Sequence, residues 1–314
     1  MKILKKITFA AFFSVMNLLL FAQEKMPDKA LVFGYFKNNG EDGLHMAYSK
    51  DALKWIALKN DSSFLLPSVG NDKLMRDPCI VVGGDGKFHM VWTVSWKERG
   101  IGYASSEDLI HWSTQQYLPL MEGEKDAMNS WAPEINYDPV SKRYLIYWAT
   151  TIPGKFPQSE VKGEKNHRIY LVWTKDFKQF TSPEILYDKG FNVIDASIQK
   201  SGNNYIMFLK NETKTPVAEK NIRIAFSKRI GGPYGNPSNP ITGNYWAEGP
   251  TAIKKEGKWI VYFDKYNDHK YGAVTSADLK KWKDISDQLI MPEGIRHGTV
   301  FEVSATVLEK LMKQ

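Results

Sequence analysis

The sequence predicts an all-β protein, a five-bladed β-propeller, and two observations lead to this fold class. Five short segments share one design, in which a polar residue opens an apolar strand: residues 76–80, 131–135, 194–198, 248–253 and 297–301. Their key residues lie 57, 61, 53 and 49 positions apart: Asp77, Glu134, Asp195, Glu248 and His297. This spacing indicates one propeller blade per repeat, because a four-stranded blade takes about 40–50 residues.

Each of the first four segments is followed by two more predicted strands. The second strands are rich in aromatic and β-branched residues and follow turn residues, such as Gly-Gly-Asp-Gly at 83–86, which is typical of β-hairpins. We predict second strands at 88–92, 144–148, 205–208 and 259–263. Third strands are predicted at 101–104, 169–173, 222–226 and 271–274.

Related outer segments end three of the units, at residues 108–112, 176–180 and 278–282. The third unit has Gly-Gly-Pro-Tyr-Gly at 231–235 instead. Because Trp112, Phe180 and Trp282 recur at this outer edge, we interpret them as packing between blades rather than as sugar platforms.

The two ends of the chain complete the ring. Residues 30–58 contain only the later strands of a unit, at 30–36 and 44–48, followed by an outer segment at 51–55. The missing inner strand is supplied by residues 297–303. We therefore predict that N-terminal strands pair with the C-terminal inner strand, which closes the ring and removes exposed sheet edges.

Residues 1–22 have the features of a secretory signal peptide, which leaves residues 23–314 as a single propeller domain. Three lysines at positions 2, 5 and 6 precede an apolar stretch from 7 to 21, and Phe21-Ala22-Gln23 offers a cleavage site. The alternative, an uncleaved anchor, is disfavoured because the apolar stretch is short for a membrane span. We expect a periplasmic or secreted protein with no transmembrane segment after cleavage.

Charge and cysteine content exclude several classes of protein. Removal of residues 1–22 deletes three lysines and no acid, so the net charge falls from +7 to +4. Without a dense basic segment, this charge does not support nucleic-acid binding. Cys79 is the only cysteine, which excludes an intramolecular disulfide; its apolar surroundings predict a buried side chain. We expect a monomer.

Four carboxylates and a histidine should converge at one mouth of the central channel. Two carboxyl groups at such a mouth suit acid/base cleavage of a glycosidic bond, and an inverting enzyme needs them about 6.5–9.5 Å apart so that water fits between. A neighbouring negative charge can raise the pKa of the acid. Taken singly, each motif could simply form a turn in which the aspartate or glutamate bonds its own backbone. Because the motifs recur at matching points of the repeat, a functional role of these residues is favoured.

Three motifs resemble those of glycoside hydrolase family 43 and occur in the same order on successive blades. They are Arg76-Asp77-Pro78, Ile194-Asp195-Ala196-Ser197-Ile198 and Trp246-Ala247-Glu248-Gly249-Pro250. The resemblance spans nearly the whole mature chain and implies a five-bladed propeller. It implies that Asp77 is the general base, Glu248 the general acid and Asp195 the residue that tunes the pKa of the acid, with no cofactor required.

Other residues near these motifs are candidate substrate or metal contacts. Glu134, in Trp-Ala-Pro-Glu-Ile, is interpreted as a substrate contact; a catalytic carboxylate in a rearranged site and a buried, backbone-bonded glutamate are the alternatives. The resemblance implies that His297 helps to hold a structural calcium or ordered water. Calcium prefers oxygen ligands, so water would have to supply most of its shell. Arg296 is a candidate substrate contact.

Four tryptophans are candidate sugar platforms, because aromatic faces pack on the C–H faces of sugars. They are Trp131, Trp246, Trp92 and Trp96. The alternative for these residues is packing in the blade core. Two long inserts, at 121–129 and 152–167, are expected to border the pocket, since loops on a rigid scaffold carry specificity.

The leading functional hypothesis is an exported, inverting glycoside hydrolase that releases α-L-arabinofuranosyl residues from plant-type polysaccharides. The alternative activities that the resemblance allows are β-xylosidase, β-galactofuranosidase, exo-galactanase and endo-arabinanase. A non-catalytic carbohydrate-binding propeller is a second class, although all three catalytic positions carry carboxylates. A relative of the invertase and fructanase group would need Asn-Asp-Pro-Asn-Gly and Glu-Cys motifs, which the sequence lacks.

Overall fold

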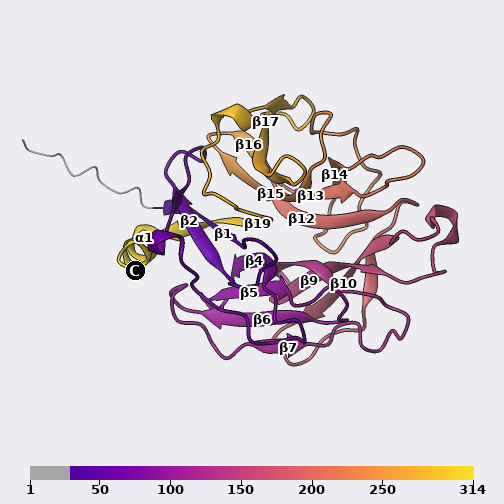
Figure 1. Cartoon of the computed structure of the whole chain (residues 1–314), viewed down its shortest axis with the longest axis horizontal. Helices are drawn as coiled ribbons and strands as arrows, with labels where there is room; N and C mark the ends of the chain where they lie inside the picture. Colours follow the sequence, from indigo (N-terminus) through magenta and orange to yellow (C-terminus); the bar gives the residue numbers. More distant parts are fainter. Residues whose placement is uncertain (1–28) are drawn as a thin grey trace, which may run out of the picture.

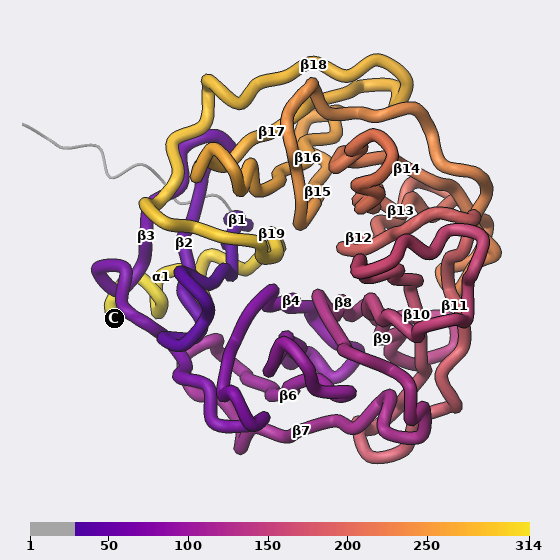
Figure 2. Tube along the Cα trace, turned by 45° about the vertical axis from the view of Figure 1, so that its right-hand side comes forward, coloured from indigo at the N-terminus to yellow at the C-terminus, as the bar shows by residue number. Residues whose placement is uncertain are grey.

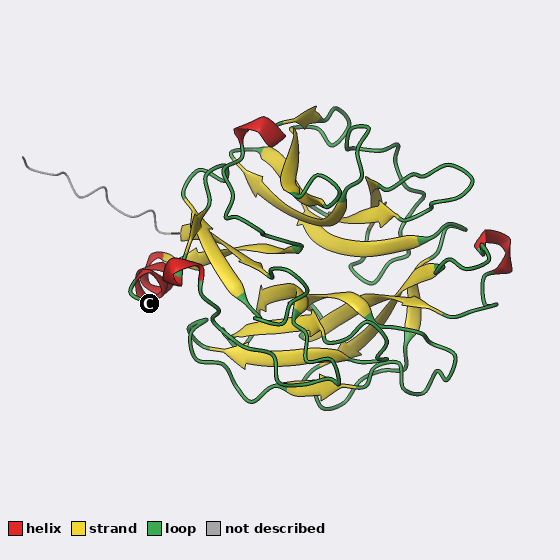
Figure 3. Cartoon of the chain, viewed as in Figure 1, coloured by secondary structure: helices red, strands yellow, loops and turns green. Residues whose placement is uncertain are grey.

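The chain forms a ring of five antiparallel sheets, which confirms the predicted five-bladed β-propeller. The computed structural model describes residues 29–314, so the predicted signal peptide at 1–22 lies outside the described residues. Four of the sheets have four strands and one has three. The described chain consists mainly of strands and loops (Figures 1 and 3).

The blades follow one another along the chain. The first blade contains β4 (Arg76–Val82), β5 (Phe88–Thr93), β6 (Ile101–Ser106) and β7 (Gln116–Leu118). The second contains β8 (Trp131–Asp138), β9 (Arg143–Thr151), β10 (His167–Thr174) and β11 (Glu184–Tyr187). The third contains β12 (Val193–Ser201), β13 (Asn204–Asn211) and β14 (Asn221–Ser227). The fourth contains β15 (Glu248–Lys255), β16 (Lys258–Lys265), β17 (Lys270–Ser276) and β18 (Lys283–Asp284).

The fifth blade joins the two ends of the chain, as predicted. It consists of β19 (Gly298–Ser304), β1 (Lys29–Tyr35), β2 (His45–Ser49) and β3 (Ile56–Ala57). β19 runs antiparallel to β1, in a register that pairs Lys29 with Ser304 and Tyr35 with Gly298. Figure 2 shows the closed ring, with β4, β8, β12, β15 and β19 nearest its centre. The five inner strands therefore surround the axis of the ring.

A C-terminal helix follows β19 and was not predicted from the sequence. The helix α1 (Ala305–Met312) begins where the Ser304 hydroxyl accepts a hydrogen bond from the Val307 amide, and it buries Leu308 and Leu311. The other helical segments are the short 3₁₀ turns η1 (Lys59–Asp61), η2 (Pro157–Ser159) and η3 (Ser286–Gln288). Within residues 29–314 no helix is long and apolar enough to cross a membrane.

The outer segments of four blades are tight turns, each followed by a short outer strand. In each turn the Oδ1 atom of an aspartate accepts two backbone amides at 2.8–3.0 Å, in Asp51, Asp108, Asp176 and Asp278. The third blade, with Gly-Gly-Pro-Tyr-Gly at this place, has no fourth strand. Such an Asx-type turn thus goes together with an outer strand.

The hydrophobic core lies between the blades in five clusters, one for each pair of neighbouring sheets. The aromatic residues that end the outer segments pack against these clusters, as predicted: Trp112, Phe180 and Trp282. Cys79 is buried in the cluster between the first and second blades, also as predicted. Because each sheet buries both faces, the positions of the inner strands around the channel are held rigidly.

Candidate active site

Four inner strands, β4, β8, β12 and β15, each have a β-bulge at their N-terminal end. Pairing with the second strand shifts between Arg76 and Cys79, Trp131 and Glu134, Ile194 and Ser197, and Glu248 and Thr251. One residue of each bulge has a positive φ: Asp77 (52°), Ala132 (46°), Asp195 (53°) and Gly249 (60°). Aspartate and glycine adopt this conformation more readily than most residues. The bulge re-aims the side chains at this end of each strand.

The bulges show that the four carboxylates are not equivalent, so this part of the sequence prediction is wrong. Asp77 and Asp195 both occupy the positive-φ position. Glu248 lies one residue before it, whereas Glu134 lies two residues after it. Shifts of one or two residues were hidden by the loosely regular spacing of the repeats.

A cavity of about 150 Å³ lies at the bulged ends of the inner strands and brings Asp77, Asp195 and Glu248 together. Its lining residues come from all five blades or the loops that join them: Arg76, Asp77, Thr93, Trp96, Trp131, Ala132, Ile194, Asp195, Lys210, Glu212, Glu248 and His297. At Gly249 a Cβ atom would lie 2.3 Å from Cγ of His297, so the histidine ring needs a glycine there. The three carboxylates of the predicted motifs, which come from three blades, thus share one cavity with a fourth carboxylate, Glu212.

Asp77 is held as an ionised carboxylate. Its Oδ2 atom accepts a hydrogen bond from the Thr93 hydroxyl at 2.8 Å, and its Oδ1 atom lies 3.3 Å from Nδ1 of His297. Burial raises the pKa of Asp77, but contact with His297, followed by the charge of Arg76 and the Thr93 hydrogen bond, lowers it to about 2. A carboxylate in this state can accept a proton at neutral pH.

His297 lies in the channel as a buried cation. Burial lowers its pKa, but Asp77, Asp195 and Glu134 together raise it to about 9. Among residues 29–314 there is no group of three or more side chains that could hold a metal ion. The predicted calcium would therefore find in His297 a single protein ligand, one that is occupied with Asp77, and the calcium hypothesis remains a prediction.

Asp195 and Glu248 occupy different electrostatic surroundings. Asp195 accepts the Gly249 amide at 3.0 Å, and burial raises its pKa despite the charges of His297 and Lys210. Glu248 instead contacts two cations: Lys210 Nζ lies 2.9 Å from Oε2, and Arg296 Nη2 lies 3.4 Å from Oε1. Arg296 also binds Asp264 through Nε. The predicted substrate contact Arg296 is thus engaged by two carboxylates.

Three polar residues that sequence reasoning missed come from the second strands. They lie opposite the bulged ends of the inner strands: Thr93 opposite Arg76, Lys210 opposite Ile194 and Asp264 opposite Glu248. Each of them ends an apolar run, at 88–92, 205–209 or 259–263. A polar residue at the site end of an otherwise apolar strand was the signal that would have found them.

Two of the four candidate sugar platforms line the cavity. Trp96 is 42% exposed, and its ring meets that of Trp131 edge to face at 5.3 Å. Lys165, from the insert at 152–167, places Nζ 3.5 Å from the centroid of the Trp131 ring. Trp246 is exposed and packs against Tyr266, outside the residues that line the cavity. The aromatic wall of the site is therefore formed by Trp96 and Trp131.

The prediction that Trp92 is a sugar platform is wrong. Its side chain is completely buried in the core between the fifth and first blades. A Cβ atom at Gly102 would lie 2.0 Å from the indole ring, so the glycine makes room for it. The aromatic pattern at 88–92 is explained by packing between blades.

Glu134 lies in a different cavity from Asp77. It is buried in the channel, 3.2 Å from the thiol of Cys79, and lines a cavity of about 410 Å³ at the opposite end of the inner strands. Burial, partly offset by His297, raises its pKa to about 7. The prediction that Glu134 faces the substrate pocket is therefore wrong, and Glu134 is not part of the proposed site.

The cavity at one end of the five-bladed ring holds carboxylates beside Trp96 and Trp131, and a pair of acids next to an aromatic face matches the chemistry of carbohydrate cleavage. The chain belongs to the family of probable glycosyl hydrolase domains related to glycoside hydrolase family 43, since the model of that family matches residues 27–309. This match confirms the resemblance drawn from the motifs.

One known protein is similar to this chain in sequence, and solved structures share its fold. An α-L-arabinofuranosidase of Bifidobacterium longum subsp. longum is 23% identical over an alignment of 205 residues, which covers 58% of this chain and 19% of that protein. This chain thus spans about a fifth of that relative's length. The structure of an α-L-arabinofuranosidase from Lactobacillus brevis superposes with a TM-score of 0.54 at 16% identity, over 68% of this chain and 72% of that chain. A thermostable family-43 glycoside hydrolase gives a TM-score of 0.52 at 18% identity, over 67% and 71%.

Proposed function

We propose that this chain is a glycoside hydrolase that cleaves with inversion and releases terminal sugar residues, α-L-arabinofuranosyl residues first among them. The observation that carries the proposal is the single cavity that holds Asp77, Asp195 and Glu248. Family membership and the arabinofuranosidase names of two similar proteins support it. The cavity of about 150 Å³ is small beside ordinary ligand clefts of about 300–1,000 Å³, which favours a single sugar residue.

In the proposed reaction Asp77 acts as general base and Glu248 as general acid. Asp77 accepts a proton from water as the water attacks the anomeric carbon, while Glu248 gives its proton to the departing glycosidic oxygen. The solvent then takes the proton from Asp77 and returns one to Glu248. Asp195, which bonds the amide next to Glu248, positions the acid and adds a negative charge nearby. Trp96 and Trp131 carry the apolar face of the sugar.

We also propose export to the periplasm or the medium, on the basis of the signal-like residues 1–22, and action as a monomer without a required cofactor. The alternative is a non-catalytic carbohydrate-binding propeller. A protein of that kind would hydrolyse no glycoside, and the three carboxylates would have no catalytic role.

A panel of nitrophenyl glycosides tests the function directly. Purified protein is incubated with α-L-arabinofuranoside, β-D-xyloside and β-D-galactofuranoside substrates, and release of nitrophenol is followed. We expect the arabinofuranoside to be hydrolysed fastest. Tight oligosaccharide binding with no turnover of any glycoside would overturn the proposal and favour a carbohydrate-binding protein.

Two tryptophan variants separate a sugar platform from a core residue. Trp92→Ala should lower the free energy of unfolding by about 3–5 kcal/mol, because it leaves a large cavity between blades. Trp96→Ala should raise KM with little loss of stability, since its ring is exposed at the cavity. Urea unfolding and steady-state kinetics measure both effects. An unchanged KM in Trp96→Ala would remove this residue from the substrate site.

A further inference from the structure

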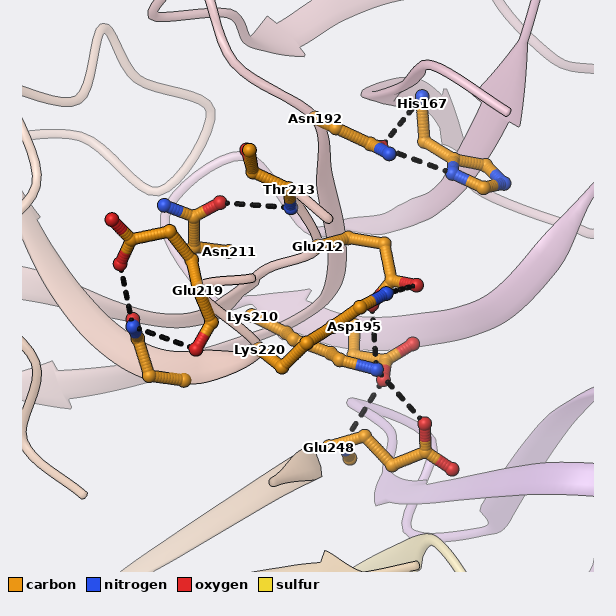
Figure 4. Close-up of polar contacts among 12 residues, drawn as sticks. His167, Asn192, Asp195, Lys210, Asn211, Glu212, Thr213, Glu219, Lys220 and Glu248 are labelled. Carbon is orange, nitrogen blue, oxygen red and sulfur yellow. Dashed lines mark hydrogen bonds and ion pairs between the residues drawn. The ribbon is translucent and has the colours of Figure 1, made fainter. Parts of the chain in front are cut away.

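A continuous chain of ion pairs crosses three blades and passes through Glu248. It alternates in charge along its whole length: Lys220, Glu212, Lys210, Glu248, Arg296 and Asp264. The N–O separations are 2.6 Å between Lys210 and Glu212 and 2.9 Å between Lys210 and Glu248. Figure 4 shows the Lys210 ammonium group pointing toward Glu248, with Glu212 and Lys220 on its other side.

Lys210 is the most deeply buried cation that touches Glu248. Its side chain is 3% exposed, against 29% for Arg296. A buried ammonium group is tolerated only when it is paired, and the pairing here is with the carboxylates of Glu248 and Glu212. Burial lowers the pKa of Lys210, but these carboxylates and Asp195 raise it well above the ordinary value, so Lys210 stays charged. The ring of Tyr266 lies 4.6 Å from the ammonium group.

Lys210 is a cation in direct contact with the carboxyl group that acts as general acid in the proposed reaction. A general acid must carry a proton, whereas a cation in contact favours the ionised carboxylate. Arg296 shares its charge with Asp264, and Lys210 shares its charge with Glu212. The strength with which Lys210 acts on Glu248 therefore depends on Glu212, which is itself bound by Lys220.

We propose that Lys210 is a positioning residue that fixes the Glu248 carboxyl group and opposes its protonation, and that Glu212 moderates this effect by holding Lys210. This inference rests on the proposed function, because it concerns the acid of that reaction. It adds a residue pair from the third blade to a site whose acid belongs to the fourth.

Other charged and titratable groups face Glu248 from the elements packed around it. They are Asp195 on β12, Asp264 on β16, Tyr266 after β16, Tyr271 on β17 and Arg296 before β19, all of which interact electrostatically with it. None of these groups forms ion pairs with both Glu248 and Glu212. Lys210 alone among the described residues bonds both Glu248 and Glu212.

The pH dependence of kcat/KM tests the proposal, because its basic limb reports loss of the acid's proton in the free enzyme. Lys210→Met should move this limb to higher pH by about one unit or more, since an opposite charge in contact lowers a carboxyl pKa by about 1–3 units. Glu212→Gln should move the limb to lower pH, because Lys210 then acts on Glu248 without its counter-charge. Opposite shifts in the two variants are the expected result.

Two further variants serve as controls. Lys210→Arg keeps the positive charge and should leave the basic limb near that of the wild type. Lys165→Met removes a lysine that lies over the Trp131 ring, outside the residues that line the cavity, and should not shift the limb. An unshifted limb in Lys210→Met, or an equal shift in Lys165→Met, would contradict the proposal.

A titration without substrate separates this proposal from the proposed function. The Glu248 carboxyl signal, assigned by its loss in Glu248→Gln, is followed by ¹³C NMR in protein labelled at the glutamate side chains. Its midpoint should rise in Lys210→Met and fall in Glu212→Gln even in a protein that hydrolyses no glycoside. Identical midpoints in folded Lys210→Met and wild type overturn the assignment of Lys210. If Lys210→Met does not fold, the fall of the midpoint in Glu212→Gln decides the question in the same way.

Discussion

Glu248→Gln should lower kcat/KM by about 10²–10⁴-fold on a glycoside with a poor leaving group, because an amide cannot give a proton to the departing oxygen. On a dinitrophenyl glycoside the loss should be far smaller, since dinitrophenolate leaves without protonation. The ratio of the two losses is the measurement, taken from steady-state kinetics of wild type and variant on both substrates. Equal losses on the two substrates would show that Glu248 does not act as the acid.

Glu134→Gln is the matched control for this experiment. It makes the same change at a buried carboxyl group that lines the opposite cavity. With its pKa raised to about 7 by burial, Glu134 is protonated for much of the time at neutral pH, so glutamine is a close replacement. We expect near wild-type kinetics. A loss in Glu134→Gln as large as that in Glu248→Gln would instead support a rearranged catalytic site.

Asp77→Asn should lower kcat/KM by about 10²–10⁴-fold on every glycoside, whatever the leaving group, because the attacking water is no longer deprotonated. Azide attacks without losing a proton and should therefore restore turnover, with a glycosyl azide of inverted configuration as product. For the wild type, ¹H NMR of the first sugar released should show the inverted anomer. A retained anomer would overturn the inverting mechanism.

The Asp77 variant needs a control for folding, because the carboxylate pairs with the buried cation His297. Thermal unfolding of Asp77→Asn and of the double variant Asp77→Asn/His297→Gln measures this structural contribution. We expect the double variant to regain stability, since a buried charge without its partner is removed, and to remain inactive. Activity in a folded Asp77→Asn protein without azide would exclude Asp77 as the base.

The sequence predicted the number of blades, the order of their strands and the closure of the ring. These features follow from apolar runs of strand length, separated by turn residues and repeated along the chain. The change to Gly-Gly-Pro-Tyr-Gly at 231–235 marked the third blade, which lacks a fourth strand. The missed helix α1 had a local signal as well, since Ser304 stands as an N-cap before Leu308 and Leu311.

The architecture and the carboxylates at the start of the inner strands could be predicted, because both depend on local patterns that recur along the chain. Which carboxylates meet depends on the folded arrangement of the blades. The bulge shifts Glu248 and Glu134 to opposite sides of the positive-φ position, and a change of one residue in a strand reverses the face to which a side chain points. The contact of Lys210 with Glu248 likewise exists only through the packing of the third blade against the fourth. Such a contact joins residues of two separate sheets, so no pattern within either segment encodes it.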